Sequence, residues 1–237
     1  MQRGRRVLVV GATGRLGVAV AHALAQRGDR VVLTARDPGR LQALAAEVGH
    51  EPGAPAAFVQ ADLLEDGAPE AIAESARRAV GQVDDVVLAC GPFPRTPLDA
   101  LRRDDLRHTL TVHAIAPLLL VQALAADLTG SRGAVVALTD AGVTRPYTNH
   151  VAYLTAKGAL QAGLRALSVE LAPEVRVNMV ALGIVADPEA DADPLRLHRL
   201  ATRTPLGRFG SPEEVVHVVL SLLDATWATG EIWGVGR

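Results

Sequence analysis

A tyrosine and a lysine four residues apart, Tyr153 and Lys157, are the side chains of this sequence best suited to chemistry. The chain has 24 lysines and arginines, and Lys157 is the only lysine among them. Residues at i and i+4 share a helix face, so the phenol and the ammonium group would point the same way. A nearby cation lowers the pKa of a phenol, which is ordinarily about 10. We therefore predict that this pair transfers protons; a surface tyrosine and lysine is the alternative interpretation.

A glycine-rich turn near the N-terminus is the second candidate site. It contains Gly11, Thr13, Arg15, Leu16 and Gly17, between a predicted strand and a predicted helix. Glycines there let the backbone turn tightly and approach a pyrophosphate at the helix N-terminus. A purely structural turn is the alternative, but the position between the first strand and the first helix favours dinucleotide binding.

The residues after the second and third predicted strands indicate which nucleotide binds. NAD sites usually place an acid after the second strand, whereas this chain has Arg36 there. Arg15 and Arg36 together suit a ribose 2′-phosphate, which favours NADPH. Asp37, next to Arg36, leaves NADH as the less favoured alternative. The alternative interpretation of Arg36 is a solvated surface residue without a role in binding. Asp62 and Leu63 follow the third strand, where the carboxylate suits the adenine amino group.

Asp140 follows the fifth predicted strand, at the sheet edge where this architecture places active-site groups. The alternative is that Asp140 only starts a turn with Gly142. The segment 184–204 is rich in aspartate and proline and also follows a strand. We predict a substrate loop there, with an ordinary surface loop as the alternative.

Short β-branched runs alternate with amphipathic stretches of helical length along the whole chain. The predicted strands cover 6–10, 31–35, 57–60, 86–89, 134–139, 175–180 and 231–233. The predicted helices cover 15–27, 38–48, 70–80, 103–128, 152–171 and 211–223. Such alternation predicts an α/β fold with a doubly wound parallel sheet, in one domain over 1–237.

Composition excludes several classes of protein. The net charge is −2 and 21% of residues are charged, without the basic patch of a nucleic-acid binder. Cys90 is the only cysteine, which rules out an intrachain disulfide and favours a cytoplasmic location. The apolar stretch 114–126 is shorter than the ~20 residues of a membrane span. We expect a small-molecule substrate, no nucleic-acid or membrane partner, and no bound metal.

These motifs together resemble the short-chain dehydrogenase/reductase family over essentially the whole chain. The matching segments are Gly11 to Gly17, Asp62-Leu63, Tyr153 to Lys157, 176–178 and Thr229-Gly230. The resemblance implies a single-domain Rossmann fold with seven parallel strands. It also implies that Gly91, Gly183 and Lys157 contact the cofactor. It further implies a homodimer or homotetramer built through the helices at 103–128 and 152–171.

Within this family the chain is most similar to the pteridine reductases. Arg15 stands where most members have the middle glycine, and Asp140 stands where most have a catalytic serine. Phe93 matches the aromatic residue that stacks on the pterin ring. The resemblance implies that Arg15, Phe93, Asp140 and Tyr153 bind a pteridine. It also implies that Tyr153, Lys157 and Asp140 are catalytic, with Tyr153 donating the proton.

Three positions depart from the family pattern. Leu88-Ala89-Cys90-Gly91 replaces Asn-Asn-Ala-Gly, His113 replaces a helix asparagine, and Leu182-Gly183 replaces Pro-Gly. A histidine can relay protons near neutral pH, so His113 is included among the catalytic candidates. Two alternatives to pteridine reduction stay open. One is a carbonyl or 3-oxoacyl reductase, and the other is an NADP(H)-binding pseudoenzyme or sensor.

Overall fold

The computed structural model describes residues 4–49, 54–185, 194–202 and 204–236, and it contains one seven-stranded sheet. The strand order is β3-β2-β1-β4-β5-β6-β7, and every neighbouring pair is parallel. The strands are β1 (Arg6–Val10), β2 (Arg30–Ala35), β3 (Ala57–Gln60), β4 (Asp85–Leu88), β5 (Ala134–Asp140), β6 (Arg176–Leu182) and β7 (Ile232–Val235). The predicted seven-stranded, doubly wound parallel sheet is therefore confirmed.

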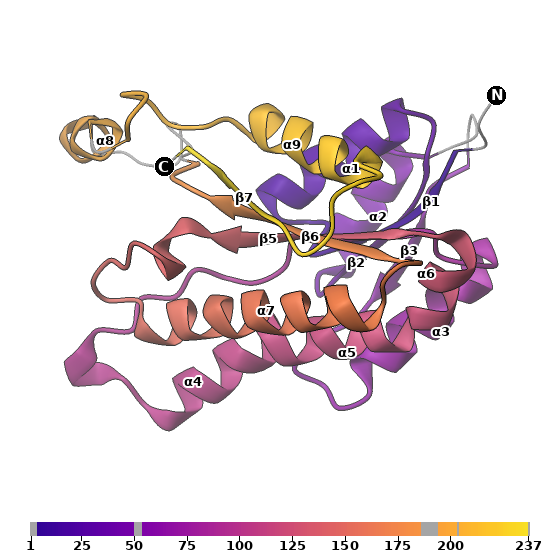
Figure 1. The fold of residues 1–237 in the computed structure, drawn as a ribbon, viewed down its shortest axis with the longest axis horizontal. Coiled ribbons are helices and arrows are strands. Elements are labelled where there is room, and N and C mark those ends of the chain that lie inside the picture. Colours follow the sequence, from indigo (N-terminus) through magenta and orange to yellow (C-terminus); the bar gives the residue numbers. More distant parts are fainter. Residues whose placement is uncertain (1–3, 50–53, 186–193, 203, 237) are drawn as a thin grey trace.

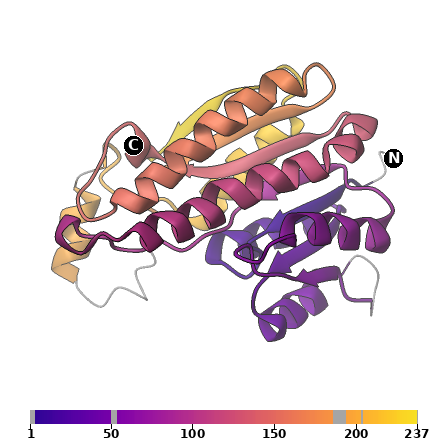
Figure 2. The ribbon, with the colours of Figure 1, turned by 90° about the horizontal axis from the view of Figure 1, so that it is seen from below.

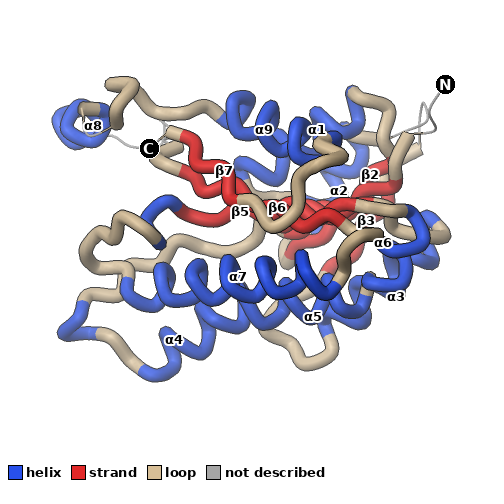
Figure 3. The backbone as a smooth tube through the Cα atoms, viewed as in Figure 1, coloured by secondary structure: helices blue, strands red, loops and turns tan. Residues whose placement is uncertain are grey.

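Helices cover both faces of the sheet, which is why its strands are nearly continuous apolar runs (Figures 1 and 3). One face is covered by α1 (Arg15–Gln26), α2 (Pro38–Glu47) and α9 (Pro212–Asp224). The other face is covered by α3 (Ala68–Val80), α5 (Ala116–Ala123) and α7 (Val151–Glu170), and α4 (Arg103–Leu110) packs against α7. Each layer packs its own apolar cluster against the sheet. Seen from below, α7 runs beside the α4–α5 helix (Figure 2).

The helix predicted over 103–128 is not regular. A π turn, Thr111–Ile115, separates α4 from α5, and α6 (Ala125–Ser131) follows after a bend of 57°. The N–H of Ala116 bonds to the carbonyl of Thr111, one residue further back than in an α-helix. The next residue, Pro117, has no N–H to donate, so the ladder cannot continue in α-helical register there.

No single helix in the described ranges is long and apolar enough to cross a bilayer. The bent pair Arg103–Ala123 and Ala125–Ser131 meets that length and composition only when taken together. Leu120, Leu124 and Leu128 of this pair are fully buried in the protein core.

The segment predicted as an irregular substrate loop, 184–204, contains a helix that the sequence analysis missed. This helix, α8 (Pro194–Ala201), lies at the end of the molecule where the strands have their carboxyl ends (Figure 1). Four of its eight residues are arginine, histidine or proline, which obscures its apolar spacing. Residues 186–193 and 203 of the segment lie outside the described residues.

Candidate active site

A cleft of about 690 Å³ opens at the carboxyl ends of β1, β2 and β4. This is where the strand order reverses direction, the usual ligand site of an open parallel sheet. Six of the predicted cofactor residues line it: Gly11, Thr13, Arg36, Asp62, Leu63 and Gly91. The cleft therefore brings the glycine turn and the ends of four strands, β1 to β4, to one place.

The backbone around the glycine turn leaves no room for a side chain. Gly11 has φ of +79°, and an added Cβ would lie 2.6 Å from the Cα of Cys90. A side chain at Gly11 would therefore be strained and would push β1 away from the end of β4. This close backbone approach, at the start of α1, fits a dinucleotide whose pyrophosphate needs backbone N–H groups.

Two arginines, Arg36 and Arg40, lie at the rim of the cleft, and only Arg36 was predicted from the sequence. Arg36 follows β2, and Arg40 lies one helical turn further on, with its guanidinium 2.6 Å from the carbonyl of Thr13. Asp37 also lines the cleft, and it caps α2: its Oδ1 accepts a hydrogen bond from the N–H of Arg40 at 3.0 Å. The i, i+4 spacing of Arg36 and Arg40 was the signal that could have found the second arginine.

Arg15, Leu16, Gly17, Lys157 and Gly183 are not among the residues that line this cleft. Leu16 packs on the core, and Gly17 is buried beside the carbonyl of Gly11. The guanidinium of Arg15 donates to the carbonyl of Val185, just after β6. Arg15 thus ties the glycine turn to the segment after β6, rather than lying beside Arg36 at the cleft rim.

Asp140, the last residue of β5, accepts hydrogen bonds from two tyrosines. Its Oδ2 lies 3.0 Å from the hydroxyl of Tyr153 and 3.0 Å from that of Tyr147. Its Oδ1 accepts from the N–H of Gly142 at 2.6 Å. Asp140 therefore starts the turn with Gly142 and also contacts Tyr153.

Lys157 is on the same face of α7 as Tyr153, as the spacing predicts. Its ammonium nitrogen lies 5.8 Å from the centre of the Tyr153 ring and donates to the carbonyl of Leu138 at 2.9 Å. Lys157 is only 6% exposed. Burial, the largest influence, lowers the pKa of Lys157 below its usual range.

The expected lowering of the Tyr153 pKa is wrong for this structure. Burial and the negative charge of Asp140 raise the pKa of Tyr153 above its usual value. The carboxylate is in direct contact with the hydroxyl, whereas the ammonium of Lys157 is bonded to a backbone carbonyl. Tyr153 is consequently protonated at neutral pH.

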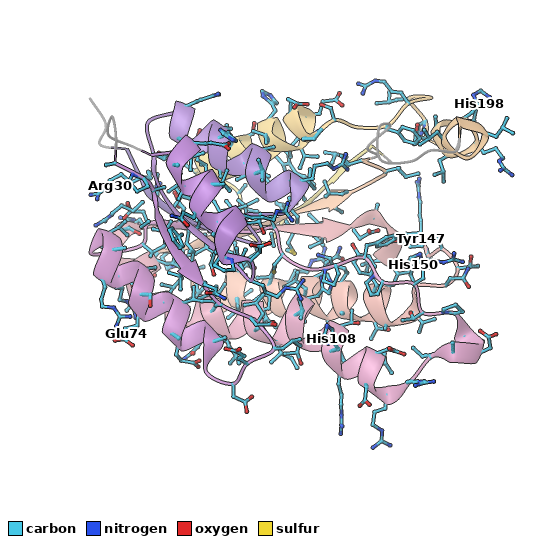
Figure 4. All side chains as sticks on the ribbon, turned by 180° about the vertical axis from the view of Figure 1, so that it is seen from behind. Arg30, Glu74, His108, Tyr147, His150 and His198 are labelled. Atoms are coloured by element: carbon cyan, nitrogen blue, oxygen red, sulfur yellow. The ribbon has the colours of Figure 1, made fainter. Side chains whose placement is uncertain are left out.

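Aromatic rings from the loops after β4 and before α7 pack around the ring of Tyr153. Phe93 stacks on His150 with centroids 4.1 Å apart, and it meets Tyr153 edge-on at 4.8 Å. Tyr147 and His150 lie side by side at this end of the molecule (Figure 4). Phe93 is 57% exposed, so much of its ring is open to a substrate. Tyr147 and His150 belong to this site although the sequence offered no spacing rule that singled them out.

Comparison with known proteins agrees with this geometry. Residues 11–236 match a family model described as enoyl-(acyl carrier protein) reductase. The chain is 34% identical to human L-xylulose reductase, with 93% of this chain and 89% of that protein covered. It is 31% identical to the 3-oxoacyl-[acyl-carrier-protein] reductase FabG of Aquifex aeolicus, with 97% and 95% covered. The chain belongs to the short-chain dehydrogenase/reductase family.

Solved structures of this family superpose closely on the chain. A short-chain dehydrogenase/reductase of the glucose/ribitol dehydrogenase type from Brucella melitensis is 30% identical, with a TM-score of 0.90 over 98% of this chain and 94% of that one. The L-sorbose reductase of Gluconobacter frateurii, solved with NADPH and L-sorbose, has a TM-score of 0.90 at 22% identity, over 98% and 95% of the two chains. The second likeness supports the fold only.

His113 lies at the buried centre of this short-chain dehydrogenase/reductase. It is 1% exposed, lies in the π turn, and its ring centre is 5.3 Å from that of Tyr153. Its Nε2 lies 2.9 Å from the carbonyl of Pro92, which can only accept, so Nε2 carries the proton. Its Nδ1 is buried and has no hydrogen-bond partner among the described residues. Gly91 makes room for the ring, because a Cβ there would overlap it.

We expect His113→Asn to make the stability of the enzyme less sensitive to acid. Burial lowers the pKa of His113 to about 3, against about 6.5 in an unfolded chain. Between these values the unfolded chain binds one more proton, so the free energy of unfolding falls as the pH drops. Between pH 7 and pH 5 the wild type should lose about 2 kcal/mol more than the variant.

Urea unfolding at both pH values measures this difference. His217→Asn, at an exposed position on α9, is the matched control and should behave as the wild type does. Equal losses of stability in wild type and His113→Asn would show that His113 is not held neutral by the fold.

Proposed function

We propose that the protein is an NADPH-dependent reductase in which Tyr153 is the proton donor, and that its substrate is a pteridine. The observation that carries the proposal is the hydrogen bond between Tyr153 and Asp140, beside Lys157 and the exposed ring of Phe93. A reductase needs a protonated acid next to the reacting bond, and the Tyr153 hydroxyl is protonated at neutral pH.

The residues around the cleft fit a dinucleotide, which when bound supplies a hydride to the substrate. Gly11, Gly14 and Thr13 line the phosphate side, and Asp62 lies where the adenine would be held. Arg36 and Arg40 together present two guanidinium groups for a ribose 2′-phosphate. Asp37 is engaged as the cap of α2, which supports NADPH over NADH.

Tyr153 gives its hydroxyl proton to the nitrogen or oxygen of the bond that is reduced. The tyrosine becomes a phenolate at that moment, in a buried site that already contains the carboxylate of Asp140. The ammonium of Lys157 lies 5.8 Å from the centre of the Tyr153 ring, and its positive charge stabilises the phenolate. The role of Lys157 is therefore to stabilise the charge that develops on Tyr153 during reduction, when the resting hydroxyl is protonated.

A pteridine is the substrate that the polar and aromatic groups support best. Asp140 is an acceptor for the ring N–H and amino groups of such a heterocycle, and Phe93 offers a face or edge for stacking. A serine, the usual residue at this position of the family, would instead donate to a carbonyl. His113, close to Tyr153, has an acceptor nitrogen that suits a water in the proton path.

Phe93→Leu tests the pteridine substrate. Aromatic stacking contributes about 0.5–1.5 kcal/mol, so the KM for a dihydropterin should rise up to about tenfold. Activity with a small aliphatic ketone, where it exists, should change little. The measurement is NADPH oxidation, followed by its near-ultraviolet absorbance, with dihydrobiopterin, xylulose and a 3-oxoacyl thioester as substrates. An unchanged KM for dihydrobiopterin would contradict the stacking role.

A carbonyl reductase is the second candidate, because relatives at 31–34% identity are described as L-xylulose reductase and 3-oxoacyl reductase. Turnover of xylulose or the thioester, without turnover of dihydrobiopterin, would favour this function. The proton-transfer chemistry at Tyr153 would be the same, since a ketone oxygen then receives the proton.

We also propose that the enzyme is cytoplasmic and assembles as a homodimer or homotetramer through α4–α5 and α7. Large apolar side chains are exposed on these helices and the turn between them, namely Ile115, Leu119, Val151 and Val169. A second copy of the chain would cover them.

A further inference from the structure

We propose that Tyr147 is a positioning residue that controls the proton of Tyr153 through Asp140. This inference rests on the proposed function, because it takes Tyr153 as the proton donor. Tyr147 and Tyr153 donate to the same oxygen, Asp140 Oδ2, at the same distance of 3.0 Å. The two hydroxyls therefore share one acceptor and cannot act independently.

The fold holds Tyr147 in this place by more than its hydroxyl. Its ring packs edge-on against His150, with centroids 5.3 Å apart, and against Phe93 at 6.0 Å. The ring also lies directly over Gly142, where an added Cβ would overlap Tyr147 Cε1. Gly142 in turn donates its N–H to the second oxygen of Asp140. The short turn after β5 thus fixes the carboxylate and makes room for the second phenol.

Sharing an acceptor matters at the moment when the proton leaves. To protonate a substrate, the hydroxyl of Tyr153 must turn away from Asp140, in a site where Tyr153 is 8% exposed. Asp140 is half-buried, and the loss of a hydrogen bond to its oxygen costs free energy unless another donor remains. Tyr147 is that donor, and burial and Asp140 raise its pKa so that it stays protonated. Tyr147 therefore lowers the cost of freeing the Tyr153 hydroxyl.

Asp140 is the acceptor that both phenols share, so its hydrogen bonds decide how easily the Tyr153 hydroxyl is released. The titratable groups that face Tyr153 or lie beside its neighbours are Asp140, Tyr147, His150, His113, Lys157 and Cys90. Among them Asp140 is the group in direct contact, so a change in its hydrogen bonds acts most strongly on Tyr153.

Tyr147→Phe tests the proposal, because it removes the hydroxyl and keeps the ring that packs over Gly142. We expect kcat for reduction to fall about tenfold, as one charge-assisted hydrogen bond is worth about 1.5–3 kcal/mol at most. The KM for NADPH should not change.

Asp140→Asn separates positioning from a general loss of structure. In the Asp140→Asn background the carboxylate charge is absent, so adding Tyr147→Phe should lower kcat less than about twofold. Thr144→Val removes a hydroxyl that donates to the carbonyl of Ala141 in the same turn, and this control should keep the wild-type kcat. Matching melting temperatures show that the variants are folded.

Two results would overturn the inference. One is a wild-type kcat in Tyr147→Phe, and the other is an equal loss of kcat with and without the Asp140 carboxylate. Failure of the proposed function has a different signature: Tyr153→Phe would then keep its turnover. If Tyr153→Phe is inactive and Tyr147→Phe behaves as the wild type does, only the role of Tyr147 is wrong.

Discussion

Tyr153→Phe is expected to lower turnover by about 1,000-fold while leaving the affinity for NADPH within about twofold of the wild type. Proton donation at a positioned acid contributes about 100- to 10,000-fold, and phenylalanine has no proton to give. Tyr153 is outside the nucleotide cleft, and Asp140 keeps Tyr147 and Gly142 as donors in the variant. The fold and the cofactor site should therefore be intact.

Steady-state NADPH oxidation and a fluorescence titration with NADPH measure the two quantities separately. Thr144→Val, which removes a hydroxyl bonded to the carbonyl of Ala141 in the turn after β5, is the control that should keep full turnover. Wild-type turnover in Tyr153→Phe would mean that the proton comes from another group.

Replacing Arg36 and Arg40 together with alanine is expected to weaken NADPH binding by about 100-fold and NADH binding by less than about threefold. Each guanidinium-to-phosphate hydrogen bond contributes about 1.5–3 kcal/mol, and NADH lacks the 2′-phosphate that receives it. Arg36→Ala alone should give about a tenfold loss, because Arg40 remains at the same rim.

Isothermal titration of both cofactors with the single and double variants measures this preference. Arg30→Ala is the matched control, since Arg30 is exposed at the start of β2 and lies at the opposite end of the molecule from Tyr147 (Figure 4). Equal losses for NADPH and NADH would contradict the assignment of these arginines to the 2′-phosphate.

Much of the fold followed from the sequence because parallel strands and their covering helices have distinct patterns. The continuous apolar run of β1 and the glycines after it placed the cleft correctly. The spacing of Tyr153 and Lys157 placed both on one face of α7. In each case a local period determines the direction of the side chains, so no long-range contact had to be known.

The features that were missed depend on contacts between distant segments. Tyr147 lies in a loop, and its ring contacts Gly142 and Phe93. Its position in the sequence gave no signal that predicts these contacts. The raised pKa of Tyr153 results from the depth of burial and the approach of Asp140, which a spacing of 13 residues does not reveal. The sequence predicted the parts of the site but not the hydrogen bond that sets the protonation of the acid.

Transfer of deuterium from NADPH labelled at the nicotinamide C4 tests most directly whether the protein reduces a pteridine. The wild-type protein is incubated with the labelled NADPH and, in separate reactions, dihydrobiopterin, xylulose or a 3-oxoacyl thioester. The mass of each product is then measured by mass spectrometry. We expect one deuterium in the reduced pterin with the wild type, and none with Tyr153→Phe. NADPH that binds to the wild type at saturating concentration and labels no product would contradict a reductase and favour a nucleotide sensor.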